Sequence, residues 1–165
     1  MRPLVLFAIL LSCAPVSLLG EDSSPESKTV ACTFQDGKEM SVRYDPNGAP
    51  KKDSLPVGEL WPASGSPMYL FTQTELSIGD SIVPVGAYGM YVIPGKKNWI
   101  LVINRAVAAG SSYDQQQDLL RAPMEIGHFS ESQPLEVALG HVAPQQCNLR
   151  IYFGKTGAWT EFKEK

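Results

Sequence analysis

Residues that commonly carry catalytic chemistry are scarce in this chain of 165 residues. It contains two histidines and three cysteines, and it has no G-x-S-x-G motif that would present a nucleophilic serine. Gly154-Lys155-Thr156-Gly157 resembles part of a phosphate-binding loop, but Leu149 stands where that loop requires its first glycine. We therefore expect a hairpin turn at this segment. The sequence predicts neither a catalytic apparatus nor a cofactor.

Long apolar runs and blocks of positive charge are also missing after residue 20. No such run approaches the roughly 20 residues that a membrane-spanning helix requires. The whole chain has 14 Lys and Arg against 17 Asp and Glu, a net charge of −3. Nucleic acids and anionic membranes attract proteins through clustered basic residues. The sequence therefore predicts no nucleic-acid partner and no transmembrane segment.

The first 20 residues read as a targeting segment. Arg2 is followed by an apolar run over residues 4–11, which is too short to span a bilayer but typical of a secretory signal peptide. We expect cleavage near Gly20-Glu21 and a location in the periplasm or outside the cell. Lipid attachment at Cys13 is the alternative. Removing residues 1–20 removes Arg2, which leaves 13 basic residues against 17 acidic ones, a net charge of −4.

Two cysteines, Cys32 and Cys147, remain in the expected exported chain. Each lies in a run in which every second residue is apolar, so both side chains should face the core. Paired cysteines in an exported protein usually form a disulfide. We expect this bridge between an early and a late strand. Two separate buried thiols are the alternative.

Residues 83–104 form the clearest structural pattern of the chain. Tyr88, Tyr91 and Val92 favour a strand, Pro94-Gly95-Lys96-Lys97 favours a turn, and residues 98–104 are apolar almost throughout. A second strand that is apolar on both faces is typical of a central strand covered on each side. The pattern predicts a hairpin in the core of a β-protein.

Short alternating segments separated by turn residues continue along the rest of the chain. We expect roughly nine or ten strands and no helix of normal length, although residues 114–121 have room for one helical turn. This arrangement favours an antiparallel β-sandwich or jelly roll, with a small β-barrel as the alternative. The expected organisation is a disordered lead-in over residues 21–28 and a single domain over residues 29–165.

The two histidines, His128 and His141, each end an apolar alternation. If the two imidazoles come together, they could bind a metal with a carboxylate such as Glu125 or Glu131. Histidines that simply end core strands are the other interpretation. The spacing matches no known metal-binding motif, so convergence must be shown by the fold.

Aromatic residues beside loops give the best indication of a binding surface. Trp61 lies between two loops rich in proline, and Tyr152 shares the predicted outward face of its strand with Arg150. We name these three residues as ligand-binding candidates. Trp61 also has the alternative role of closing one end of the sandwich.

Residues 114–121 form the densest polar cluster. Asp118 and Arg121 are three residues apart, so on a regular strand their side chains point to opposite faces. We therefore expect each to pair with a neighbouring strand.

Several motifs between Leu55 and Lys163 resemble those of one protein family. They are Pro56, Gly58, Leu60 and Trp61 in LPVGELW; Pro84, Gly86, Tyr88, Ile93-Pro94-Gly95 and Trp99 in VPVGAYGMYVIPGKKNW; Asn104; and Tyr113-Asp114 with DLLR in SYDQQQDLLR. Over this stretch the chain resembles a family of exported bacterial proteins known only as a domain of unknown function. The resemblance implies an exported β-sandwich-like domain and transfers no catalytic residue.

One segment departs from that family. After the tryptophan, members usually carry a short polar run with Arg, Gly, Ala and Asn, whereas this chain has Pro62-Ala63-Ser64-Gly65-Ser66. A family site built by that run would be altered here.

Taken together, these features favour a non-catalytic binding or interaction module of the bacterial envelope. Its partner would be a small molecule, a glycan or an envelope protein. A metal-dependent or other hydrolase and a purely structural envelope protein are the alternatives.

Overall fold

The computed structural model describes residues 27–49, 54–108 and 112–165. Within these residues the chain is almost entirely β-structure, with one short 3₁₀ helix and no α-helix, which confirms the predicted all-β class. The elements are β1 (Lys28–Thr33), β2 (Glu39–Tyr44), β3 (Met68–Thr72), β4 (Leu76–Ile78), β5 (Ser81–Val83), β6 (Gly86–Ile93), β7 (Trp99–Asn104), η1 (Gln115–Gln117), β8 (Asp118–Ala143) and β9 (Gln146–Glu164). No helix in these three ranges is long and apolar enough to cross a membrane. The predicted signal peptide, Cys13 and most of the predicted lead-in lie outside the described residues.

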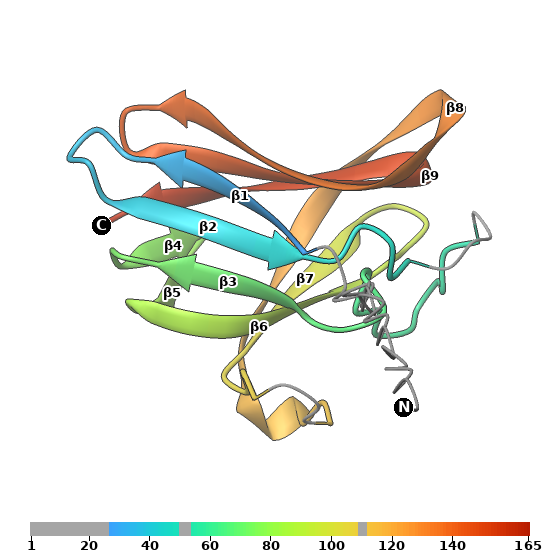
Figure 1. Cartoon of the computed structure of the whole chain (residues 1–165), viewed down its shortest axis with the longest axis horizontal. Helices are drawn as coiled ribbons and strands as arrows, with labels where there is room; N and C mark the ends of the chain where they lie inside the picture. Colours follow the sequence, from blue (N-terminus) through green and yellow to red (C-terminus); the bar gives the residue numbers. More distant parts are fainter. Residues whose placement is uncertain (1–26, 50–53, 109–111) are drawn as a thin grey trace, which may run out of the picture.

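The nine strands form one antiparallel sheet in the order β1-β2-β3-β6-β7-β8-β9-β4-β5. The sheet curls, so that β8 and β9 lie over β1, and β4 and β5 lie behind β2 and β3 (Figure 1). No ladder joins the end strands β1 and β5 within the described part of the chain. The sheet is therefore sandwich-like, and the closed barrel kept as an alternative is not found.

The long strands β8 and β9 were not predicted as single elements. Their ladder runs from the pair Glu125–Trp159 to the pair Ala143–Gln146, with register shifts near its middle. Gly154 has a φ of 59°, a conformation that glycine adopts without strain, and it lies at this irregular region. The predicted hairpin turn at residues 154–157 is wrong, because these residues continue β9 through a bend.

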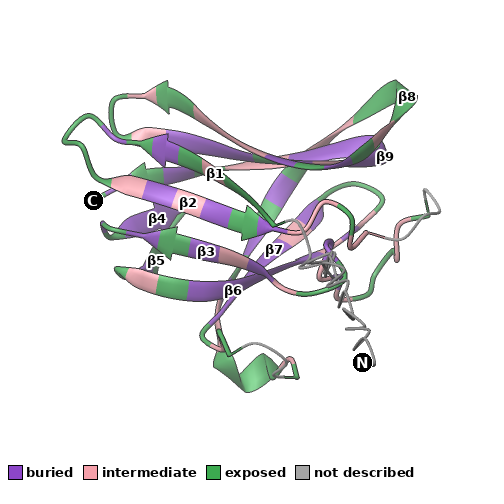
Figure 2. Cartoon of the chain, viewed as in Figure 1, coloured by how far each residue is buried: buried purple, intermediate pink, exposed green. Residues whose placement is uncertain are grey.

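The core fills the space inside the curled sheet. Trp99, Phe162, Met40 and Leu149 are among the largest side chains that are completely buried. Figure 2 shows buried positions alternating with exposed ones along β1 and β2, as expected for strands with one face on the core and one in solvent.

The predicted central hairpin is confirmed as β6 and β7. β7 lies between β6 and β8 and is buried along most of its length. Val102 and Tyr91 are buried outside the main core cluster. The ring of Tyr113 packs on Tyr91 with centroids 5.1 Å apart. The β7–β8 connection therefore covers part of the outer face of this hairpin.

The predicted disulfide is present between Cys32 of β1 and Cys147 of β9. Their Cα atoms are 6.3 Å apart, within the usual range for a disulfide, and 115 positions separate them in the sequence. The bridge ties the first strand of the described chain to the last.

Candidate functional site

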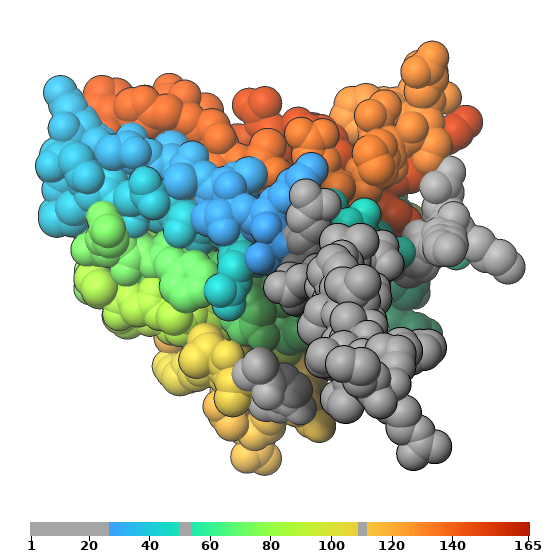
Figure 3. Space-filling model, in the orientation of Figure 1, coloured from blue at the N-terminus to red at the C-terminus, as the bar shows by residue number. Residues whose placement is uncertain are grey.

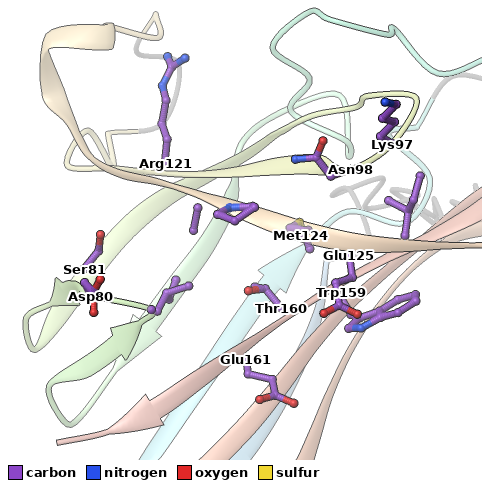
Figure 4. Close-up of a pocket in the computed structure, with 15 residues that line it drawn as sticks. Asp80, Ser81, Lys97, Asn98, Arg121, Met124, Glu125, Trp159, Thr160 and Glu161 are labelled. Atoms are coloured by element: carbon purple, nitrogen blue, oxygen red, sulfur yellow. The ribbon is translucent and has the colours of Figure 1, made fainter.

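An open groove of about 880 Å³ lies beside the point where β8 and β9 separate. Its walls come from the β4–β5 turn (residues 78–81), from Lys97 and Asn98 before β7, from residues 121–126 of β8 and from residues 159–161 of β9. Figure 4 shows these side chains. Three connections that are distant in the sequence thus meet at one surface feature.

Strand separation explains why this region stays open. β8 bonds β7 along its first residues, but its ladder with β9 begins only at the pair Glu125–Trp159. Pro123 lies just before that pair, and proline has no N–H to donate to a second neighbour. The sequence expectation of an edge or bulge at Pro123 therefore agrees with its place on the rim of the groove.

Trp159 is the aromatic side chain of the groove. Its indole covers Gly127, where a Cβ would lie 3.2 Å from Cζ3 of the ring. The side chain is half-buried, and it stands directly across the ladder from Glu125. One part of the indole is thus held by the sheet while the rest remains accessible in the groove (Figure 4).

Charged groups of both signs surround the indole. Asp80, Glu125 and Glu161 supply carboxylates, and Lys97 and Arg121 supply positive charge. In the view of Figure 4, Lys97 and Arg121 extend to one side of β8, and Glu125 and Glu161 lie on the other. Glu161 also accepts a hydrogen bond from the side-chain amide of Gln146. The groove therefore presents hydrogen-bond donors and acceptors around an apolar plate.

Arg121 is held in place by two neighbours at the edge of the groove. Its Nε donates to Asp118 Oδ2 at 2.8 Å, and its Nη2 donates to the Tyr113 hydroxyl at 2.7 Å. The Tyr113 hydroxyl in turn donates to Asp118 Oδ2 at 2.8 Å. Three polar side chains thus form a closed triangle of hydrogen bonds.

Asn104 extends this triangle into the buried part of the protein. Its Nδ2 donates to Asp118 Oδ1 and to the Asp114 carbonyl, each at 2.8 Å, and its Oδ1 accepts from the Ala106 N–H at 2.9 Å. The Asn104 side chain is fully buried, and its bonds satisfy both ends of the amide. The network fixes the β7–β8 connection on the sheet.

The direct contact of Asp118 with Arg121 corrects the expectation that they point to opposite faces. Ile103 pairs with Leu120, but the next β7 residue, Asn104, pairs with Asp118, so Leu119 is an extra residue in β8. A bulge of this kind breaks the alternation of side chains. It brings Asp118 onto the face of Arg121.

The network also changes the acid–base properties of two members. Hydrogen bonding to Asp118, with a smaller effect from Tyr113, raises the pKa of Arg121. Burial raises the pKa of Tyr113, and its hydrogen bond to Asp118 acts in the same direction. Both groups therefore keep their protons at neutral pH.

Trp61, named from the sequence as a binding candidate, lies in the core. It is 5% exposed, and its ring packs on Trp99 with centroids 6.1 Å apart and on Phe153 with centroids 5.1 Å apart. Its backbone exchanges two hydrogen bonds with Val92, of 2.7 and 3.0 Å. This placement agrees with the alternative role of closing one end of the sandwich.

The other two binding candidates lie on β9, outside the groove. Tyr152 is half-buried and packs on Phe129 with ring centroids 5.7 Å apart. Arg150 is exposed, and its Nε donates to Asn148 Oδ1 at 2.5 Å. The structure does not bring Trp61 together with this pair, because Trp61 is enclosed in the core.

The two histidines occupy opposite ends of one arm of β8. His128 pairs with Thr156 beside the bend, and His141 pairs with Cys147 close to the β8–β9 turn. Across residues 27–49, 54–108 and 112–165, no group of three His, Cys, Asp or Glu side chains is arranged to hold a metal ion. The geometry thus gives no support to a shared metal site.

Comparison with known proteins places these features in a family. The family model described as "Protein of unknown function (DUF2911)" matches residues 24–162. The chain belongs to the DUF2911 family. A search of curated proteins and a search of solved structures each found no match.

The motifs that suggested an uncharacterised family meet in space in this DUF2911 chain. Trp61 of LPVGELW bonds Val92, and the Gly58 N–H donates to the Pro94 carbonyl at 2.8 Å. The SYDQQQDLLR motif supplies Tyr113, Asp118 and Arg121 of the polar network. The family motifs thus stabilise two connections, one at each end of the β6–β7 hairpin.

The segment at which this DUF2911 chain departs from the expected pattern has unusual backbone geometry. Ala63 has a φ of 56°, which is rare for a residue other than glycine. The Ser64 N–H donates to the Pro62 carbonyl at 2.6 Å, which closes a tight turn around Ala63. Ala63 and Ser64 are both buried, so the surrounding packing maintains this conformation.

Sequence reasoning missed Trp159 and the rest of the groove. Trp159 was visible as one of three tryptophans, but the residues around it come from four separate segments. The only local signal was Gly127, which pairs with Gly157 and leaves room for the indole.

Proposed function

We propose that this protein is an exported, non-catalytic binding module whose groove takes a small, hydroxyl-rich ligand such as a glycan. The observation that carries the proposal is the half-buried indole of Trp159, surrounded by polar side chains in an open groove. Small-ligand sites commonly combine an apolar wall with a few polar groups in a concavity of about 300–1,000 Å³. The groove, at about 880 Å³, is of this size.

The chemistry of the lining favours a neutral polar ligand over a strongly charged one. Carboxylates of Asp80, Glu125 and Glu161 accept hydrogen bonds, while Lys97 and Asn98 donate them. Opposite charges in one groove offset each other, which reduces attraction for a ligand of a single sign. A sugar offers hydroxyls to such groups and an apolar face to the indole.

The first test is tryptophan fluorescence combined with a thermal-shift panel of sugars, peptidoglycan fragments and divalent metals. Trp61 and Trp99 are buried, so a ligand in the groove should change chiefly the emission of Trp159. A ligand at about 100 times its dissociation constant stabilises the native state by roughly 2.7 kcal/mol. A sugar that shifts both the melting temperature and the emission supports the proposal.

Variants locate the bound ligand. Trp159→Phe keeps a ring over Gly127 but shortens the plate, and Glu125→Gln removes one carboxylate. We expect each to weaken sugar binding by roughly tenfold, which corresponds to 1.4 kcal/mol. Arg150→Gln is the matched control, because Arg150 is an exposed β9 residue outside the groove. Unchanged affinity in both groove variants, or a loss only in Arg150→Gln, would contradict the proposed site.

A further inference from the structure

The curled sheet has one seam at which two strands face each other without a ladder. Among the described residues β1 bonds only β2, and residues 133–143 of β8 bond only β9. The unbonded edges of β1 and of this arm of β8 face each other (Figure 1). In Figure 3 the atoms of β1, in blue, border those of β8 and β9, in orange, along the seam.

One end of the seam is closed. The Gln35 N–H, just after β1, donates to the Pro144 carbonyl, just after β8, at 3.0 Å. Cys32 is bonded to Cys147, which is the ladder partner of His141 on β8. The final residues of β1 thus lie beside the final residues of β8.

The other end of the seam is open. Lys28 and Val30 at the start of β1 face residues 134–137 of β8 across a cavity of about 470 Å³. Because both ends match start to start and end to end, β1 and this arm of β8 run in the same direction. They diverge from the disulfide toward Lys28.

This shared direction is unusual in the molecule. Every strand pair found in the described residues is antiparallel. Strand directions alternate across an antiparallel sheet. Two neighbours that run the same way with a gap between them are therefore what remains when one strand is left out. A strand inserted in the gap would be antiparallel to both β1 and β8.

The walls of the gap suit such a strand. Leu135, Val137 and Tyr44 are buried side chains that line it, and Val30 is half-buried beside them. Lys28 and Glu136 place one charge of each sign at its rim. An extended segment with apolar residues at alternate positions would cover the apolar walls and bond the strand edges.

We propose that this gap is a strand-addition site for an extended segment of a partner protein. The chain's own residues 21–26, Glu-Asp-Ser-Ser-Pro-Glu, contain no large apolar side chain and include a proline, so they do not match the walls. The site lies apart from the Trp159 groove and does not depend on the function proposed for it.

Amide hydrogen exchange of the purified protein tests the open edges directly. We expect rapid exchange for the β1 amides that do not bond β2 and for the outward amides of residues 135–137. Adding a capped seven-residue peptide of alternating valine and threonine should slow these amides. The same peptide with alternate amides N-methylated keeps its side chains but loses its donors, and we expect at least tenfold weaker binding. Slow exchange in the free protein, or equal binding of both peptides, would overturn the proposal.

Two matched variants place the peptide. Val30→Lys puts a charge at the wall of the gap, a device by which natural edge strands resist pairing. Val142→Lys puts the same charge on an exposed position of β8 near the closed end. We expect loss of peptide binding only in the first variant, with both variants showing the native circular dichroism spectrum. Protection of the same amides by concentration-dependent dimerisation without peptide would instead assign the site to a second copy of the chain and overturn the partner assignment.

Discussion

Gly89 of β6 lies against the backbone carbonyl of Ala106. A Cβ on Gly89 would be only 2.7 Å from that oxygen. Asn104 holds Ala106 in this position by accepting its N–H, and Asn104 is itself the ladder partner of Gly89. The β7–β8 connection can therefore approach β6 only because residue 89 has no side chain.

Substitution of this glycine should displace the connection. We expect Gly89→Ala to lower the free energy of unfolding by about 1–3 kcal/mol, the usual cost of overpacking a tight contact. Gly140→Ala is the control, because nothing lies within 4 Å of a Cβ at that position. Urea denaturation of both variants measures the difference. Equal stabilities would show that Ala106 moves away without cost.

The buried amide of Asn104 gives a second prediction. Asn104→Ala removes the hydrogen-bond partner of Asp118 and of two backbone groups, and each buried group left unpaired costs about 1–3 kcal/mol. We expect a loss of at least about 2 kcal/mol in the free energy of unfolding. Gln116→Ala, at an exposed position of η1, should leave stability unchanged. A small effect of Asn104→Ala would mean that water replaces the amide.

Alkaline pH should weaken the fold. Burial raises the pKa of Tyr88, Tyr91 and Tyr113 above the ordinary value of 10.0. The native state then binds these protons more tightly than the unfolded state does. The resulting stability is complete below pH 10 and is lost as the pH rises through the folded-state values. Thermal unfolding between pH 8 and 12 should show this fall, and Tyr113→Phe should reduce its slope.

Loss of the disulfide should reduce stability strongly. The bridge closes a loop across 115 positions, which the chain-entropy model associates with roughly 4–5 kcal/mol. We expect a double variant, Cys32→Ala with Cys147→Ala, to lose about this amount in urea denaturation. Reducing agent should destabilise the native protein similarly and leave the double variant unaffected. A sensitivity of the double variant to reductant would point to a cause other than this bridge.

The parts of the fold that sequence predicted well are those set by local patterns. β6 and β7 follow directly from β-branched and aromatic residues around Pro94-Gly95, and the disulfide follows from two cysteines on core-facing alternations. The bend of β9 was missed because glycines at residues 154 and 157 permit either a turn or a curved strand. The choice depends on β8, which keeps its ladder with β9 on both sides of the bend.

The candidate site was less predictable, because it depends on register and on distant contacts. The alternation rule placed Asp118 and Arg121 on opposite faces, and one extra residue, Leu119, reversed that result. Trp61 appeared accessible because prolines surround it in sequence, yet its segment folds back onto β6 and buries the ring. Trp159 became part of a groove only through strands and turns that the sequence does not connect.

The long separation between Cys32 and Cys147 sets an order of events in folding. β1 can pair with β2 as soon as residue 44 is available, but its bond to β9 must wait until residue 147 exists and β8 is in place. No other cysteine occurs from residue 32 onward, so the waiting thiol has no wrong partner within that part of the chain. Oxidation therefore marks chains that have assembled their final two strands, and a thiol assay during refolding would report completion of the fold.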